Sequence, residues 1–301
     1  VGLDDLVLEL APDVLHLHNL MNPTVLEWAA SRPNALLTVQ DHRFFCPTRG
    51  KWTLGGEVSR RPMTREICAS CFEDQAYFRG VHALTERRLR AARRLPLTVL
   101  SRYMREELVA AGAPPWRVHV VPPFVHRLDP GPAPSGPPCV LFVGRLVEAK
   151  GVRDAVAAWR RSGVPFPLVL AGTGPLRAEL TAQAGRGEGP ELEVPGWVER
   201  DRLPGLYRRA RALLLPSRWQ EPFGIVGLEA LSFGVPVVAW ESGGVEEWHP
   251  GPDLAPWGDV EGLARALADA VNRRVTLPAR FERHETIGRL LAIYARRSTS
   301  S

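Results

Sequence analysis

Five short apolar runs divide the second half of the chain, and a stretch with helical period follows each one. The apolar runs occupy residues 140–143, 168–171, 192–194, 212–215 and 235–239. The stretches with helical period occupy residues 152–161, 176–184, 203–210, 225–232 and 260–271. Buried strands that alternate with helices are typical of a parallel sheet with helices on both faces. We therefore predict a doubly wound α/β domain over residues 139–278.

The first half shows the same pattern less completely. Its short apolar runs lie at residues 14–17, 36–39, 97–100 and 118–121. Neither a strand nor a Gly-rich turn precedes the helix expected at residues 3–10, and residues 46–72 form an insertion that carries three cysteines. We predict a second α/β domain over residues 1–128 that is incomplete at its start.

A Pro- and Gly-rich segment separates the two halves. Residues 129–138 contain five prolines and two glycines, which exclude a helix or a central strand. The segment is therefore predicted to be a stiff linker between two domains, a number that suits a chain of 301 residues. A last helix is expected within residues 279–301.

Charge and hydropathy exclude several classes of protein. No apolar run approaches the roughly 18 residues that span a bilayer, and no signal peptide opens the sequence. The net charge of +5 suits an anionic ligand and is too small to indicate nucleic-acid binding. Four cysteines in a chain of this length do not indicate a disulfide framework. A cytoplasmic protein is the expectation.

Basic residues follow the first strand of the second domain. Gly144 and Arg145 come directly after it, and Lys150, one of two lysines in the chain, stands at the start of the next helix. Ligands of open parallel sheets bind beyond the carboxyl ends of the strands. There a glycine lets the backbone approach the ligand, while Arg and Lys together neutralise a diphosphate. We predict a diphosphate site at this loop.

The next two strand ends carry further features of a ligand site. Gly172 and Gly174 form a close-approach loop before a helix. Arg177 replaces the third glycine of a dinucleotide fingerprint, so an NAD-dependent dehydrogenase is disfavoured. Trp197 and Val198 follow the third strand, where a nucleotide base could lie against the indole.

Two glutamates follow the fourth strand. Glu221 lies in the loop, and Glu229 lies in the second turn of the next helix. Backbone N–H groups at the start of that helix, near Gly224 and Ile225, would face an anion. Glu229 can accept two hydrogen bonds from neighbouring ribose hydroxyls, and Glu221 would then face the group beyond the phosphates. The pattern indicates a nucleotide that carries a further group.

Together these motifs resemble the retaining glycosyltransferases of family 4, which have the GT-B fold. The resemblance rests on Gly144-Arg145 with Lys150-Gly151, Gly172-x-Gly174-Pro175, Gly196-Trp197-Val198 and Glu221-x-Phe223-Gly224-x4-Glu229. It covers the second domain and, more loosely, residues 12–47 and 97–125. It implies two Rossmann-like doubly wound parallel-sheet domains that face each other across a cleft, the first incomplete here. It also implies a last helix, around residues 281–296, that crosses back to the first domain.

The resemblance implies transfer of a sugar from a UDP- or GDP-linked donor, with UDP slightly preferred and the anomeric configuration retained. Arg145 and Lys150 would stabilise the departing diphosphate in place of a metal, so no cofactor besides the donor is expected. Glu229 would hold the ribose, Val198 would contact the base through its backbone, and Glu221 would hold the donor sugar. Retention in this family is usually described as attack on the sugar from its front face, which needs no enzyme nucleophile. The other donor-binding residues that the resemblance implies are Gly144, Gly172, Gly174, Trp197, Phe223, Gly224 and Ile225.

The acceptor would be a sugar, a lipid-linked molecule or a small molecule on the side of the first domain. The family often has a histidine at the position of Gln40, and a glutamine cannot exchange protons near neutral pH. His42 is the nearest substitute. Of His16 and His18, on the first strand, one is expected to pack inward, and either could line the cleft. Two alternatives therefore remain open: a non-catalytic nucleotide-sugar-binding protein, and a nucleotide-sugar epimerase or phosphorylase of the same fold.

The cysteines of the insertion have two interpretations. Cys46, Cys68 and Cys71 are either reduced thiols or three of four zinc ligands, with His42 or His82 as the fourth. Because only three thiol ligands are visible, reduced thiols are the preferred interpretation.

The helix expected at residues 74–94 is strongly basic. It carries six arginines from Arg79 to Arg94. They form either a solvated face or a patch that touches an anionic membrane, and a lipid-linked acceptor would favour the second.

Overall fold

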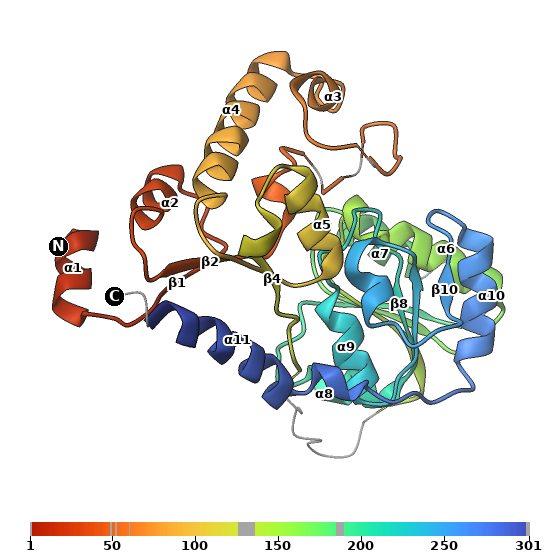
Figure 1. Cartoon of the computed structure of the whole chain (residues 1–301). Coiled ribbons are helices and arrows are strands. Elements are labelled where there is room, and N and C mark those ends of the chain that lie inside the picture. The colour runs from red at the N-terminus through yellow and green to blue at the C-terminus, as the bar shows by residue number, and fades with distance from the viewer. Residues whose placement is uncertain are drawn as a thin grey trace. The chain divides into compact units, whose positions relative to one another are not determined.

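The structure, a computed structural model of the 301-residue chain, describes residues 2–48, 50, 51, 53–59, 61–125, 136–184 and 190–298. The contacts between its residues divide it into two compact units (Figure 1). Unit 1 comprises Val1–Pro122 with His284–Ser301, and unit 2 comprises Pro123–Arg283. Of the linker expected at residues 129–138, only residues 136–138 are among those described.

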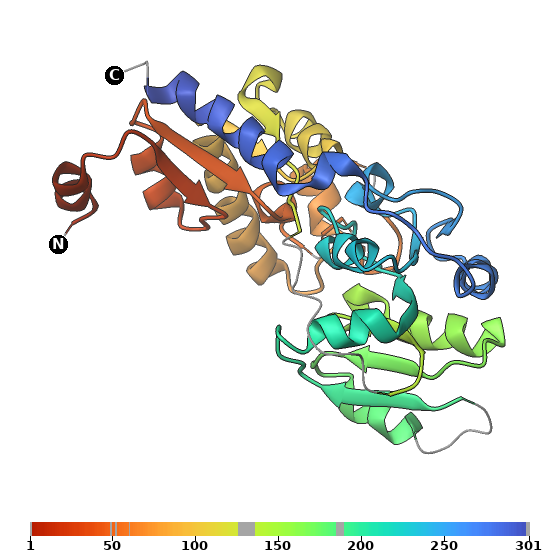
Figure 2. The same ribbon diagram turned by 90° about the horizontal axis from the view of Figure 1, so that it is seen from below.

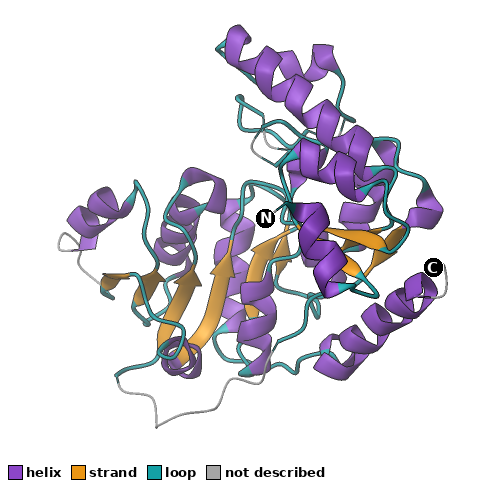
Figure 3. Cartoon of the chain, turned by 90° about the vertical axis from the view of Figure 1, so that its left-hand side faces the viewer, coloured by secondary structure: helices purple, strands orange, loops and turns teal. Residues whose placement is uncertain are grey.

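Unit 2 is built on a six-stranded parallel sheet (Figure 3). Its strands are β5 (Cys139–Val143), β6 (Leu168–Ala171), β7 (Leu192–Gly196), β8 (Ala210–Leu215), β9 (Val237–Trp240) and β10 (Leu254–Ala255). The order across the sheet is β10-β9-β8-β5-β6-β7. The chain thus moves outward from β5 to β7, returns to the other side of β5 as β8, and moves outward again. This reversal confirms the doubly wound sheet.

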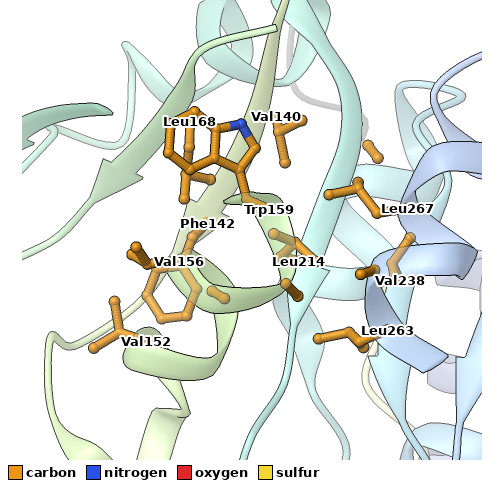
Figure 4. Close-up of a cluster of buried hydrophobic side chains, with 14 of the residues drawn as sticks. Val140, Phe142, Val152, Val156, Trp159, Leu168, Leu214, Val238, Leu263 and Leu267 are labelled. Atoms are coloured by element: carbon orange, nitrogen blue, oxygen red, sulfur yellow. The ribbon is translucent and has the colours of Figure 1, made fainter. Parts of the chain in front are cut away.

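Helices cover both faces of this sheet. They are α6 (Val152–Ser162), α7 (Arg177–Ala184), α8 (Leu203–Arg209), α9 (Ile225–Ser232) and α10 (Val260–Ala270). Figure 4 shows Trp159 of α6 and Leu267 of α10 in one cluster with Leu214 of β8. Leu213 and Leu215 alternate with Leu214 and are also buried, so the opposite face is covered as well.

Unit 1 contains a four-stranded parallel sheet. Its strands are β1 (Leu15–His18), β2 (Ala35–Val39), β3 (Leu97–Val99) and β4 (Val118–Val120), within two residues of the predicted positions. The strands lie in the order β1-β2-β3-β4, so the sheet grows in one direction. Over the residues that the structure describes, the strand order of unit 1 never reverses.

Six helices of unit 1 are described. They are α1 (Leu3–Leu10), α2 (Pro23–Ala29), α3 (Arg65–Ala69), α4 (Gln75–Ala92), α5 (Arg102–Ala110) and α11 (Arg283–Ser298). The basic helix α4 begins after Asp74, whose carboxylate accepts the N–H groups of Ala76 and Tyr77. Figure 2 shows α11 beside the strands of unit 1, where the Tyr294 hydroxyl lies 2.6 Å from His16 Nδ1. None of the described helices is long and apolar enough to cross a membrane.

Candidate active site

The strand order of unit 2 marks one place in its sheet where a ligand can enter. β5 and β8 are neighbours, yet the chain leaves them in opposite directions across the sheet. Such a point opens a crevice at the carboxyl ends of the two strands. Gly144 directly follows β5, and Ser217 stands two residues after the end of β8. The predicted diphosphate loop and the predicted glutamate loop therefore begin side by side.

The loops at this edge are packed too closely for side chains at two of the glycines. A Cβ at Gly151 would lie 1.7 Å from the carbonyl oxygen of Pro216, and the φ of Gly151 is +65°. A Cβ at Gly172 would lie 1.8 Å from the carbonyl oxygen of Gly144. These glycines bring the loops after β5, β6 and β8 into direct backbone contact. The backbone contact between the loops is therefore enough, by itself, to exclude a side chain at position 172.

Lys150 and Glu221 meet as an ion pair at this edge. The Lys150 Nζ lies 2.6 Å from Glu221 Oε1, and the Ser217 hydroxyl donates to the same oxygen at 2.5 Å. Lys150 Nζ also lies 4.3 Å from the centre of the Trp219 ring. The Glu221 carboxylate therefore fixes the Lys150 ammonium group beside the loop between β5 and α6.

Glu221 is buried, with only 3% of its surface exposed to solvent, and is nevertheless ionised. Burial opposes ionisation, but the Lys150 charge and hydrogen bonds from Lys150, Ser217 and Trp219 outweigh it and lower the pKa of the carboxyl. The loop that holds Glu221 is itself fixed, since Gly244 N–H donates to the Glu221 carbonyl at 2.8 Å. Glu221 is a rigid, charged partner for Lys150.

Glu229 lies on α9, as predicted, and is half-buried. The Tyr207 hydroxyl, from α8, donates to Glu229 Oε2 at 2.7 Å. The helix begins after Gly224, which has a φ of +87°, and no side-chain hydrogen bond caps it within the described parts of the chain. Phe223 is buried and Ile225 is exposed. The start of α9 is thus a helix N-terminus without a side-chain cap among the described residues.

Arg145 and Trp197 are two exposed residues of the predicted donor site. Arg145 is exposed and forms no ion pair with any residue that the structure describes. Trp197 is 71% exposed, and its indole N–H donates to Glu199 Oε1 at 2.9 Å. Val198 follows it and is half-buried. The side chains of Arg145 and Trp197 are therefore accessible to a ligand.

The four residues expected on the acceptor side lie in unit 1. Gln40 is exposed just after β2, and His42 is buried, with Nε2 2.9 Å from the Tyr103 hydroxyl. His16 and His18 lie on the same face of β1, with ring centres 3.9 Å apart, and His18 is the exposed one. The structure thus turns His16 and His42 inward and leaves Gln40 and His18 facing solvent.

His16 joins three elements of unit 1. Its Nδ1 lies 2.6 Å from the Tyr294 hydroxyl of α11, and its Nε2 lies 2.6 Å from Thr38 Oγ1 of β2. Burial and the neighbouring His18 lower the pKa of His16 to about 4. His16 is therefore neutral at physiological pH. Its two hydrogen bonds connect α11 to the sheet of unit 1.

The three cysteines of the insertion line one small pocket. Cys46, Cys68 and Cys71 share it with Lys51, whose Nζ is paired with Glu107 of α5 at 2.9 Å. Burial and the neighbouring thiols raise the pKa of Cys68 to about 12, so this thiol is protonated. Among the described residues, no group of three or more His, Cys, Asp or Glu side chains is arranged to hold a metal ion.

The arginines of α4 are partly engaged inside unit 1. Arg87 pairs with Glu27 at 2.6 Å, and Arg88 Nε donates to the carbonyl of Met21 at 2.7 Å. Arg93 bonds the carbonyl of Ala111. These bonds leave fewer arginines for the predicted membrane contact, which stays a prediction.

Sequence reasoning missed the residues that hold the two glutamates. Tyr207 lies inside a helix and far from the strand ends that the motifs use, so its spacing carries no signal. Ser217 and Trp219 lie in the predicted loop between β8 and α9, where polar and aromatic neighbours of a glutamate could have indicated a buried ion pair.

Comparison with known proteins places the chain within a family. The profile described as "Glycosyl transferases group 1" matches residues 128–284. Glycogen synthase of Mycobacterium tuberculosis is 38% identical over 146 residues, 46% of this chain and 35% of that protein. The 2-deoxystreptamine glucosyltransferase of Streptomyces kanamyceticus is 32% identical over 211 residues, 63% of this chain and 54% of that protein. The chain spans about a third to a half of the length of these curated relatives.

Solved structures share the fold of the whole chain. Anabaena HepE in complex with UDP matches with a TM-score of 0.64 at 17% identity, over 98% of this chain and 81% of that one. The lipopolysaccharide outer core galactosyltransferase WaaB matches with a TM-score of 0.62 at 17% identity, over 97% and 78%. These neighbours have the GT-B fold, which this chain shares. Since the family profile matches more than half of its residues, the chain belongs to the group 1 glycosyl transferases.

Proposed function

We propose that this chain transfers a sugar from a nucleotide diphosphate-sugar to a carbohydrate, lipid-linked or small-molecule acceptor. The observation that carries the proposal is the Lys150–Glu221 ion pair at the point where the sheet of unit 2 reverses. Exposed Arg145 and the start of α9, which no described side chain caps, follow strands at the same edge. These groups together suit a diphosphate.

The two cations act on the leaving group. As the bond between the sugar and the diphosphate breaks, negative charge grows on the β-phosphate, and fixed positive charge there lowers the barrier. Lys150 is held in place by Glu221 and by the Trp219 ring, so it need not reorganise. Arg145 has no competing partner among the described residues and is available for the phosphates. We infer that the pair does the work that a metal does elsewhere.

Glu229 and the β7 loop would bind the nucleoside. The half-buried carboxylate of Glu229 accepts hydrogen bonds from ribose hydroxyls, and the Val198 backbone meets the base. Trp197 offers an exposed indole face beside it. We expect UDP to be the nucleotide rather than GDP. Structures of HepE contain UDP and UDP-glucose, and that of an Escherichia coli protein of the same fold contains UDP-2-fluoro glucose.

We infer retention of configuration by attack from the front face. The acceptor oxygen bonds to the anomeric carbon on the side that the phosphate leaves, and the departing phosphate takes the acceptor proton. The structure supports a route without a covalent enzyme intermediate, because the Glu221 carboxylate is buried and paired with Lys150. A carboxylate that is held in this way is a poor nucleophile. Glu221 instead positions Lys150 and borders the donor sugar.

A non-catalytic nucleotide-sugar-binding protein is the second candidate. Two observations favour it: Gln40 stands after β2, and His42 is buried against Tyr103. Neither offers a titratable group to an acceptor near neutral pH.

Release of nucleotide from donor sugars separates the two candidates. The full chain is incubated with UDP-glucose, UDP-N-acetylglucosamine and GDP-mannose in the presence of a chelator, with and without simple sugars as acceptors. We expect one donor to release its nucleotide, and the Arg145→Ala variant to release it at a rate lower by about 10²-fold. Arg160→Ala is the matched control, because Arg160 is exposed on α6, outside the loops of the site. Binding of a nucleotide without any release would favour the non-catalytic candidate.

A further inference from the structure

Tyr207 is hydrogen-bonded to the carboxylate of Glu229, the residue proposed above to bind the ribose. Its side chain is fully buried, and its hydroxyl donates to Glu229 Oε2 at 2.7 Å. The ring stacks on Phe233, with centres 5.4 Å apart and planes 12° from parallel. Burial and the Glu229 charge raise the pKa of Tyr207 well above its usual value, so the hydroxyl keeps its proton and remains a donor.

Glu229 is the polar residue of an otherwise apolar stretch. Its neighbours Leu228, Ala230 and Leu231 are buried, while Glu229 itself is half-buried. Within the part of the chain that the structure describes, Tyr207 supplies the one side-chain hydrogen bond to this carboxylate. Oε2 is thus fixed, and Oε1 remains for an outside partner.

We propose that Tyr207 is a positioning residue that sets how tightly the ribose of the nucleotide is held. The inference rests on the proposed donor site, in which Glu229 accepts the ribose hydroxyls. A free glutamate side chain samples several rotamers, and each productive contact must then immobilise it. The Tyr207 hydrogen bond selects one rotamer before the nucleotide arrives. Tyr207 touches no ligand itself and acts through Glu229.

A purely structural pairing makes a different prediction. If Glu229 only satisfies the buried hydroxyl of Tyr207, then breaking the pair lowers the melting temperature but leaves nucleotide affinity unchanged. If Tyr207 positions Glu229, the loss of affinity depends on the ribose hydroxyls of the ligand. The two cases therefore separate by the choice of nucleotide.

The test is a titration of the full chain with nucleotides that differ only in the ribose. UDP, 2′-deoxy-UDP and 3′-deoxy-UDP, or the guanosine set if GDP binds better, are added to wild type, Tyr207→Phe, Glu229→Ala and the double variant. Tyr207→Phe keeps the ring on Phe233 and removes only the hydroxyl. Ser232→Ala is the matched control, because the Ser232 hydroxyl lies on the same helix and bonds the Glu229 carbonyl, not its carboxylate.

We expect Tyr207→Phe to weaken UDP binding by about tenfold. The same change should weaken binding of at least one deoxy nucleotide by less than about twofold and have no effect in the Glu229→Ala background. Ser232→Ala should bind UDP like wild type. Equal UDP affinity in wild type and Tyr207→Phe, or an equal loss for all three nucleotides, would overturn the inference while the donor site stands. If wild type binds neither UDP nor GDP, the inference and the proposed function both fall.

Discussion

The two units have the same kind of sheet, but over the residues that the structure describes only unit 2 has a reversal in strand order. In unit 2 the order β10-β9-β8-β5-β6-β7 reverses between β5 and β8, and in unit 1 the described order β1-β2-β3-β4 runs one way. The basic side chains of the two units differ as well. Arg145 and Lys150 of unit 2 lie in the loop after β5, at the reversal, whereas Lys51 of unit 1 is buried in a pair with Glu107. Strand order, more than strand composition, decides where a parallel sheet can bind a ligand.

The ion pair of unit 2 offers the largest expected effect. Lys150→Met should lower the rate of sugar transfer by about 10²- to 10³-fold, because the charge on the leaving diphosphate is no longer neutralised. It should also destabilise the fold by about 3–5 kcal/mol, because Glu221 is left buried without its partner. Thermal unfolding and donor release are measured on the same samples.

A second substitution separates the two effects. Adding Glu221→Gln to Lys150→Met removes the unpaired charge, so it should restore much of the melting temperature and none of the activity. Recovery of activity in the double variant would show that Lys150 has only a structural role, as Lys51 has in unit 1.

The close packing of loops in unit 2 can be tested with two glycines of the same conformation. Gly151 and Gly163 both have a φ of +65°, but a Cβ at Gly151 would meet the Pro216 carbonyl, whereas Gly163 has open space. Gly151→Ala should cost about 3 kcal/mol or more of unfolding free energy, and Gly163→Ala about 1 kcal/mol. Denaturant unfolding measures both. Equal losses would mean that the loops after β5 and β8 do not touch.

Unit 1 should lose stability in mild acid through His16. The folded structure lowers the pKa of His16 from its ordinary 6.5 to about 4, through burial and the neighbouring His18. The unfolded chain therefore takes up a proton first as the pH falls. The stability that neutral His16 provides is complete above pH 6.5 and is lost progressively between pH 6.5 and 4. Because solvent screens this half-buried side chain, the loss should be well below the roughly 3 kcal/mol that the full pKa shift would give.

The measurement is the melting temperature of unit 1 from pH 7.5 to 4, in wild type and in His16→Gln. The glutamine can bond Tyr294 and Thr38 but cannot titrate, so the difference between the two chains should shrink as the pH falls through this window. A difference that stays constant would contradict the expected titration of His16.

Long buried runs and strand-end motifs were the predictable part of this protein. The run at residues 140–143 became β5 because parallel strands are apolar on both faces. The two-residue strand β10 was too short to produce a pattern. Arg145, Lys150 and Glu221 were predicted from their place after strands, and the structure brings Lys150 and Glu221 together.

Contacts between distant residues were not predictable in the same way. Tyr207 of α8 bonds Glu229 of α9, 22 positions later in the sequence, and His16 bonds Tyr294 across 278 positions. No spacing rule encodes such pairs, because they depend on how helices lie on the finished sheet. The burial of His42 is a similar case, since it depends on the short helical turn His42–Phe44 that follows β2.

The central claim is that unit 2 binds a nucleoside diphosphate at the reversal of its sheet. Calorimetric titration of the full chain with UDP and with GDP, in the presence of a chelator and beside a Glu229→Ala variant, tests it most directly. We expect one nucleotide to bind, and the variant to bind it more weakly by about 1–3 kcal/mol. Binding of neither nucleotide, or equal binding to wild type and variant, would contradict it.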